Sequence, residues 1–70
     1  MFEFRLYNKK GEWLYTSDMY GGKDNFTLIK TKVHQWLAIG KEAHSASIYR
    51  LSGEPVLRKP NLKSEWYKLC

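Results

Sequence analysis

The two histidines and the seven acidic residues are the side chains from which an active site or a metal site would be built. His34 and His44 are expected on one helix, where their spacing separates them by roughly 15 Å. At that distance the imidazoles cannot share a metal ion or a proton. No pair of carboxylates has a spacing that would push two pKa values apart, and no HExxH, CxxC or GxSxG motif is present. We therefore expect a protein that is not an enzyme and uses no metal or cofactor.

A basic and aromatic surface is a better candidate for function. The apolar residues at positions 2, 4 and 6 alternate with polar ones, so Arg5 and Tyr7 are expected on the face of a strand opposite to the core. Tyr49 occupies the same face of a later strand, with Tyr15 or Trp13 beside it. Rings and guanidinium groups mixed in this way form a surface on which unpaired bases stack.

Further basic groups extend this interpretation. Lys30, His34 and Lys41 lie within about 60° of arc on one flank of the main helix, and Arg58-Lys59 lies where phosphates could be reached. The complete set of predicted nucleic-acid-binding residues is Arg5, Tyr7, Lys30, His34, Lys41, Tyr49, Arg58 and Lys59. In an alternative interpretation the tyrosines are ordinary cross-strand pairs, and a C-terminal helix covers them.

The outer surface of the main helix favours another class of function, protein binding. Leu28 and Ile39 project away from its apolar arc, with Lys32 between them and Trp36 at the edge of the arc. Exposed aliphatic residues need no explanation singly, but together these four form a stripe that a partner could cover. The partner would be a larger protein with an acidic surface. Several small phage-encoded regulators of host enzymes have a similar element order, an analogy that transfers no function by itself.

The main helix is predicted over Asp24–His44, because apolar residues recur there at i, i+3, i+4 and i+7. A competing interpretation makes Phe26–Lys30 a strand, since its β-branched residues favour a pleated backbone. Pro60 ends the preceding segment, and Asn61 is positioned to cap a short C-terminal helix. In that helix the apolar positions would be Leu62, Trp66 and Leu69.

Strands are predicted on both sides of the helix. An N-terminal hairpin joins a strand over Phe2–Tyr7 to a strand over Glu12–Tyr20, in which either Trp13 and Tyr15 or Leu14 and Thr16 face the core. A third strand covers 45–51, and a short fourth strand covers 56–58 at an edge. We expect one α+β domain over residues 1–70, an antiparallel sheet of three or four strands with the long helix on one face and the short helix after it.

Composition limits the partners and the compartment. The chain has 70 residues and a net charge of +5, which favours polyanions or an acidic protein surface. Its surplus of basic residues lies in residues 46–70. Cys70 is the only cysteine, and no segment approaches the ~20 apolar residues of a membrane span. We expect a cytoplasmic protein without a membrane partner, as a monomer or a weak homodimer.

Overall fold

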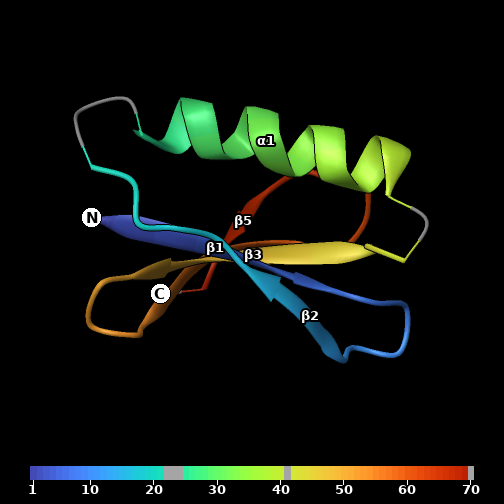
Figure 1. Ribbon diagram of the computed structural model, residues 1–70, viewed down its shortest axis with the longest axis horizontal. Coiled ribbons are helices and arrows are strands. Elements are labelled where there is room, and N and C mark those ends of the chain that lie inside the picture. Colours follow the sequence, from blue (N-terminus) through green and yellow to red (C-terminus); the bar gives the residue numbers. More distant parts are fainter. Residues whose placement is uncertain (22–24, 41, 70) are drawn as a thin grey trace.

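The computed structural model describes residues 1–21, 25–40 and 42–69. An antiparallel sheet of five strands carries the helix α1 on one face (Figure 1). The elements along the chain are β1 Phe2–Tyr7, β2 Trp13–Thr16, α1 Asn25–Ile39, β3 Ser45–Arg50, β4 Pro55–Lys59 and β5 Tyr67–Lys68. The strand order across the sheet is β2-β1-β3-β4-β5. The predicted α+β architecture is confirmed, with five strands instead of three or four.

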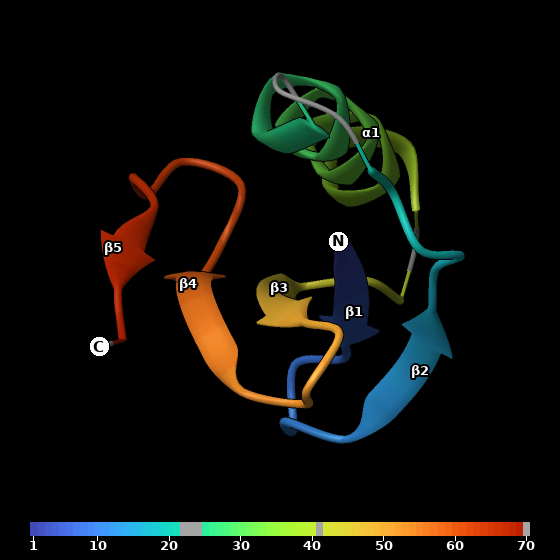
Figure 2. The same ribbon diagram turned by 90° about the vertical axis from the view of Figure 1, so that its left-hand side faces the viewer.

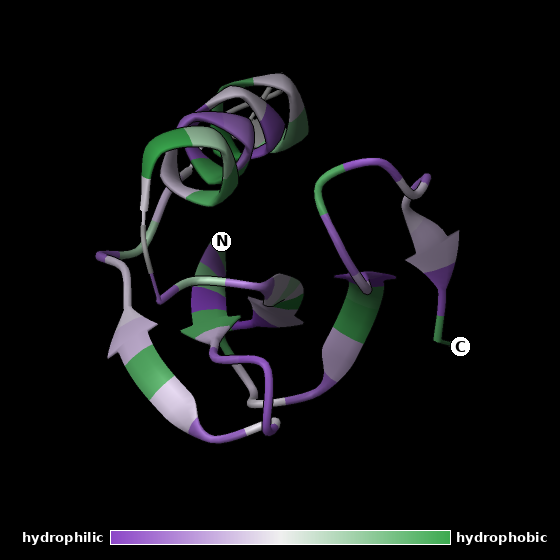
Figure 3. Ribbon diagram, turned by 90° about the vertical axis from the view of Figure 1, so that its right-hand side faces the viewer, coloured by the Kyte–Doolittle hydropathy of each residue, from purple (hydrophilic) through white to green (hydrophobic). Residues whose placement is uncertain are grey.

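The core lies between α1 and the two central strands, β1 and β3. Phe4 and Leu6 of β1 are buried, and their partners across the strand pair, Ile48 and Ala46, are buried too. From the helix, the buried residues are Ile29, Val33 and Leu37. Figure 2 shows α1 lying over these central strands, and Figure 3 shows hydrophobic and hydrophilic residues alternating along the strands and around the helix. The alternation predicted for β1 therefore places its apolar side chains toward the helix.

The helix is shorter than predicted. It spans Asn25–Ile39, so Phe26–Lys30 is helical, and the competing strand interpretation is wrong. The N–H of Gly40 still donates to the carbonyl of Trp36, but the next described residues leave the helix, and the N–H of His44 donates to the carbonyl of Tyr7 at 2.8 Å. A side chain at Gly40 would collide with the carbonyl oxygen of Trp36, so glycine is needed at this end of the helix. The predicted first residue of the helix, Asp24, lies outside the described residues.

Strand β2 contains a β-bulge that neither predicted register anticipated. Leu6 pairs with Tyr15 and Tyr7 pairs with Trp13, so Leu14 is an extra residue with no partner on β1. A bulge of this kind places two successive side chains on one face. Leu14 and Tyr15 consequently both face α1, whereas the strand was expected to present alternate residues to the core.

The predicted C-terminal helix does not form. The side chain of Asn61 accepts hydrogen bonds from the N–H groups of Lys63 and Ser64, which closes a turn, and the chain then pairs with β4 as β5. A helix of about nine residues is marginal by itself, whereas the edge of β4 supplies ready backbone partners. Leu62 and Trp66 pack against the core on the helix side of the sheet.

Candidate nucleic-acid interface

The sheet face turned away from α1, here called the open face, carries side chains from all five strands. Strand pairing places residues side by side across the sheet, so the face can be read from the register. Thr16 pairs with Arg5, Arg5 with Ser47, Ser47 with Arg58, and Arg58 with Tyr67. The same register also places on this face Glu3, Tyr7, Trp13, Ser45, Tyr49 and Pro55. No helix or strand of the described residues lies across it (Figure 2).

Two arginines and two tyrosines form the centre of the open face. The Cζ atom of Arg5 lies 4.0 Å from the ring centroid of Tyr49, and the Cζ atom of Arg58 lies 5.7 Å from that of Tyr7. The hydroxyls of Tyr7 and Tyr49 are hydrogen-bonded to each other at 2.7 Å. Each cation is therefore within cation–π range of one tyrosine ring, Arg5 closely and Arg58 near the outer limit, and the hydroxyl bond joins the two pairs.

Both guanidinium groups are also held by polar partners. Arg5 donates from Nε to Glu3 Oε2 at 2.8 Å. Arg58 donates from Nη1 to Ser47 Oγ at 2.9 Å and from Nη2 to Ser45 Oγ at 3.2 Å. A guanidinium has five N–H donors, and these bonds use one donor of Arg5 and two of Arg58. The arginines are thus oriented by the sheet, with donors remaining for a ligand.

The surroundings change the acidity of two of these groups. Burial of the Tyr7 hydroxyl raises the pKa of Tyr7 to about 12; the hydrogen bond to Tyr49 adds to the effect, and the two nearby guanidinium charges oppose it. For Arg5, the hydrogen bond to Glu3 is the largest influence, and it raises the pKa. At neutral pH Arg5 is therefore charged and the phenol of Tyr7 is neutral.

The structure brings four of the eight predicted nucleic-acid-binding residues together, and they are Arg5, Tyr7, Tyr49 and Arg58. Lys30 and His34 are exposed on α1, on the other side of the sheet. Lys41 lies outside the described residues. Lys59 is buried on the helix side, where its Nζ donates to the carbonyl of Ser64. The predicted set therefore divides between two faces, and the open face is the one that gathers basic and aromatic groups.

Two exposed rings at the edges of the open face were not among the predicted site residues. Trp13 is 62% exposed on β2, and its Nε1 donates to Thr16 Oγ1 at 2.7 Å. Tyr67 is 47% exposed on β5 beside Arg58. Trp13 was one of two alternatives in the predicted hairpin register. Tyr67 had no signal in the sequence, because its segment was predicted to be helical.

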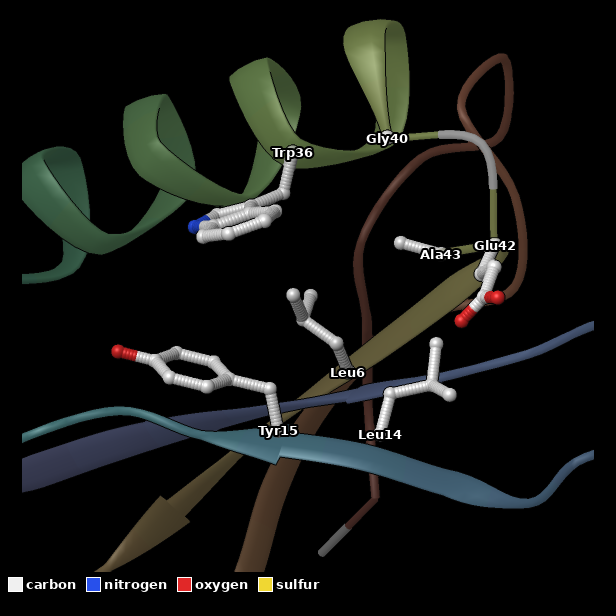
Figure 4. Close-up of a pocket in the computed structure, with 7 residues that line it drawn as sticks. All are labelled: Leu6, Leu14, Tyr15, Trp36, Gly40, Glu42 and Ala43. Atoms are coloured by element: carbon white, nitrogen blue, oxygen red, sulfur yellow. The ribbon is translucent and has the colours of Figure 1, made fainter.

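The predicted protein-binding residues lie on the opposite side of the molecule. Trp36 and Ile39 are exposed, and with Lys32 they line a cavity of about 330 Å³ beside Tyr15. A second cavity of about 370 Å³ is lined by Leu14, Tyr15, Trp36 and others (Figure 4). The two cavities share Tyr15 and Trp36, whose ring centroids are 5.6 Å apart. We call this surface the α1–β2 groove. Leu28 is exposed on α1 but does not line it.

Neither a metal site nor a membrane span is visible in the described part of the chain. No three His, Cys, Asp or Glu side chains there are close enough to hold a metal ion. Among the described residues, no helix is long and apolar enough to cross a bilayer. Comparison of the chain with protein-family models, curated proteins and solved structures finds no match. The chemistry of the surfaces themselves is thus the basis for proposing a function.

Proposed function

We propose that this protein binds nucleic acid through the open face. The observation that carries the proposal is the pair of guanidinium groups of Arg5 and Arg58, each within cation–π range of a tyrosine ring on a sheet face that the described chain leaves uncovered. Guanidinium groups bind phosphate oxygens, and both guanidinium planes and aromatic rings accept stacked bases.

The path of the C-terminal segment supports this assignment. A C-terminal helix lying across the tyrosines would have made them part of a second core. Instead, Leu62 and Trp66 pack against the core beneath α1. The chain between β4 and β5 runs on the α1 side of the sheet (Figure 2). The open face is therefore available to a ligand within the described structure.

The charge of the protein supports the same conclusion. A net charge of +5 attracts a polyanion at long range, where the sum of charges matters more than any single contact. Contacts at short range then depend on oriented donors, which Arg5 and Arg58 supply. A protein that neutralises phosphates in this way releases counterions, so its affinity must fall with salt.

The test is a titration of labelled oligonucleotides at about 50 mM and about 200 mM salt, followed by fluorescence anisotropy. If two phosphates are neutralised, the affinity for a single strand should fall roughly 7-fold between these conditions. An absence of binding at the lower salt concentration would rule out the proposed function. Affinity that is independent of salt would show that phosphates are not the groups recognised.

The α1–β2 groove favours a second function, binding of a larger protein. Its apolar side chains are unusually accessible, with Ile39 80% exposed, Trp36 45% and Tyr15 42%. Clustered exposure of this kind is typical of interaction sites, and aromatic residues dominate their energetics. Lys32 at its rim would suit a partner with an acidic surface, as an accessory protein or a phage-type regulator of an enzyme would require.

A pair of helix variants tests the groove. Ile39→Glu places a charge in the groove, whereas Leu28→Glu places the same charge on α1 outside it. In a pull-down, the Ile39 variant should lose a partner that wild type and the Leu28 variant both retain. If all three proteins capture the same partners, the groove is not a protein-binding site.

A further inference from the structure

The open face contains one row of side chains that runs across the whole sheet. The register aligns Thr16, Arg5, Ser47, Arg58 and Tyr67, one residue from each strand. With neighbouring strands about 4.8 Å apart, the row is roughly 19 Å long. It is therefore long enough to contact several nucleotides at once.

An exposed aromatic ring lies at or beside each end of the row. At the β2 end, the indole of Trp13 is fixed to Thr16 by the Nε1 hydrogen bond, and at the β5 end the row finishes in Tyr67. These rings are 62% and 47% exposed. Their accessibility contrasts with that of the central tyrosines, which are only partly exposed and have a guanidinium group beside each ring. The edge rings are consequently the ones with surface to offer to a base.

The middle of the row is cationic and oriented. Ser47 lies between Arg5 and Arg58, and its hydroxyl accepts a hydrogen bond from Arg58. The carboxylate of Glu3 is also on this face, but it is bonded to Arg5 at 2.8 Å. Ser47 itself is buried beneath these side chains, so a phosphodiester would contact the two guanidinium groups, each of which has N–H donors left.

We propose that the open face takes a single-stranded nucleic acid laid across the strands, with a base stacked on Trp13, a base stacked on Tyr67 and the intervening phosphates held by Arg5 and Arg58. This inference rests on the proposed function and adds the class of ligand and its path. The order of aromatic rings and cations across the sheet suits a nucleic-acid strand whose bases are unpaired. In a duplex the bases are stacked on one another and offer only edges and phosphates to a protein. An RNA-binding sheet that presents aromatic side chains stacks two or three bases on them, so we expect a site of about three nucleotides.

The inference is tested with a mixed-sequence single strand of about six nucleotides, prepared as DNA and as RNA, and with the same sequence as a hairpin duplex. Wild type is compared with Trp13→Ala and Tyr67→Ala, and Leu51→Ala serves as the matched control because Leu51 is exposed but lies outside the row. Circular dichroism confirms that each variant is folded. Trp13→Phe provides a second variant that keeps an aromatic ring at the β2 edge.

Each alanine variant should bind the single strand roughly 5- to 100-fold more weakly, as expected when one stacked base is lost. Trp13→Phe and the Leu51 variant should bind within about twofold of wild type. The DNA and RNA arms show whether the 2′-hydroxyl contributes. If the duplex binds as tightly as the single strand, or if either alanine variant binds normally, this path is overturned and the proposed function stands. If neither nucleic acid binds, both are overturned.

Discussion

The hydroxyl groups of Tyr7 and Tyr49 are 2.7 Å apart, although the residues are separated by 42 positions in the chain. The bond joins β1 to β3 on the open face, independently of the backbone ladder between them. It also joins two cation–ring pairs, because Arg5 lies over Tyr49 and Arg58 lies over Tyr7. The four side chains are thus ordered before any ligand arrives, which reduces the entropy lost on binding.

The raised pKa of Tyr7 predicts a loss of stability in alkaline solution. The ordinary pKa of tyrosine is 10.0 and that of Tyr7 is about 12, so between these values the unfolded chain loses a proton that the folded protein retains. The free energy of unfolding therefore falls as pH rises through this window. A shift of two units corresponds to ~2.7 kcal/mol, and because Tyr7 is only partly buried we expect about 1 kcal/mol.

Urea unfolding at about pH 9 and about pH 11.5 measures this change. Tyr7→Phe has no phenol to titrate, so the difference between wild type and variant isolates the contribution of Tyr7. The variant should lose about 1 kcal/mol less stability than wild type over the interval. Equal losses in both proteins would contradict the assignment.

Charge removal should affect nucleic-acid binding on one side of the sheet only. Arg58→Ala is expected to lower the slope of log affinity against log salt by about 0.7 to 1, because one phosphate contact is lost. Lys30→Ala removes the same charge from the exposed surface of α1 and should leave the slope unchanged. Slopes are obtained from anisotropy titrations at several salt concentrations. An equal reduction in both variants would mean that net charge, and not the open face, determines binding.

Two isoleucines on α1 should differ widely in their effect on stability. Ile29 is fully buried, and Ile29→Ala should cost about 2–5 kcal/mol through lost burial and the cavity left behind. Ile39 is 80% exposed, and Ile39→Ala should change the free energy of unfolding by no more than about 0.5 kcal/mol. Chemical denaturation of both variants measures the contrast. Comparable losses would place the helix in a different rotation about its axis.

Gly40 is expected to tolerate no side chain. A Cβ atom there would collide with the carbonyl oxygen of Trp36, which is rigid backbone. We predict that Gly40→Ala destabilises the protein by about 1–3 kcal/mol. At Gly21 the nearest atom to a Cβ would be Met1 Cγ at 3.8 Å, an ordinary contact, so Gly21→Ala should be close to neutral. Thermal unfolding of the two variants distinguishes a specific clash from a general effect of adding a methyl group.

The elements that could be predicted from sequence are those with a long, regular pattern. The alternation in β1 correctly placed Phe4 and Leu6 in the core, and hence Arg5 and Tyr7 on the other face. The 3.6-residue period correctly predicted a helix, and Ile29, one of its apolar positions, is completely buried. In both elements one face is buried, and the spacing of the apolar residues along the sequence shows which face it is.

The parts that could not be predicted depend on contacts between distant residues. The extra Leu14 in β2 breaks the alternation of faces. The four-residue sequence of β2 is too short to distinguish a bulge from a shift in strand register. Tyr67 enters the open face only because its segment pairs with β4, which local periodicity does not reveal. Lys59 was expected to reach phosphates, but its position on the helix side of β4 brings it to the carbonyl of Ser64. Tertiary pairing prevailed over local preference in each case.

The bulge at Leu14 has a consequence for how the protein behaves when concentrated. An edge strand is a template for pairing with another molecule unless it is short or twisted away. β2 has four residues and carries the bulge, and β5 at the other edge has two residues. Deleting Leu14 would leave Trp13, Tyr15 and Thr16 on their present faces but flatten the edge. We expect the shortened protein to fold and then to aggregate, visible as light scattering that rises with concentration. In this interpretation the extra residue Leu14 prevents the β2 edge from pairing with the sheet of another molecule.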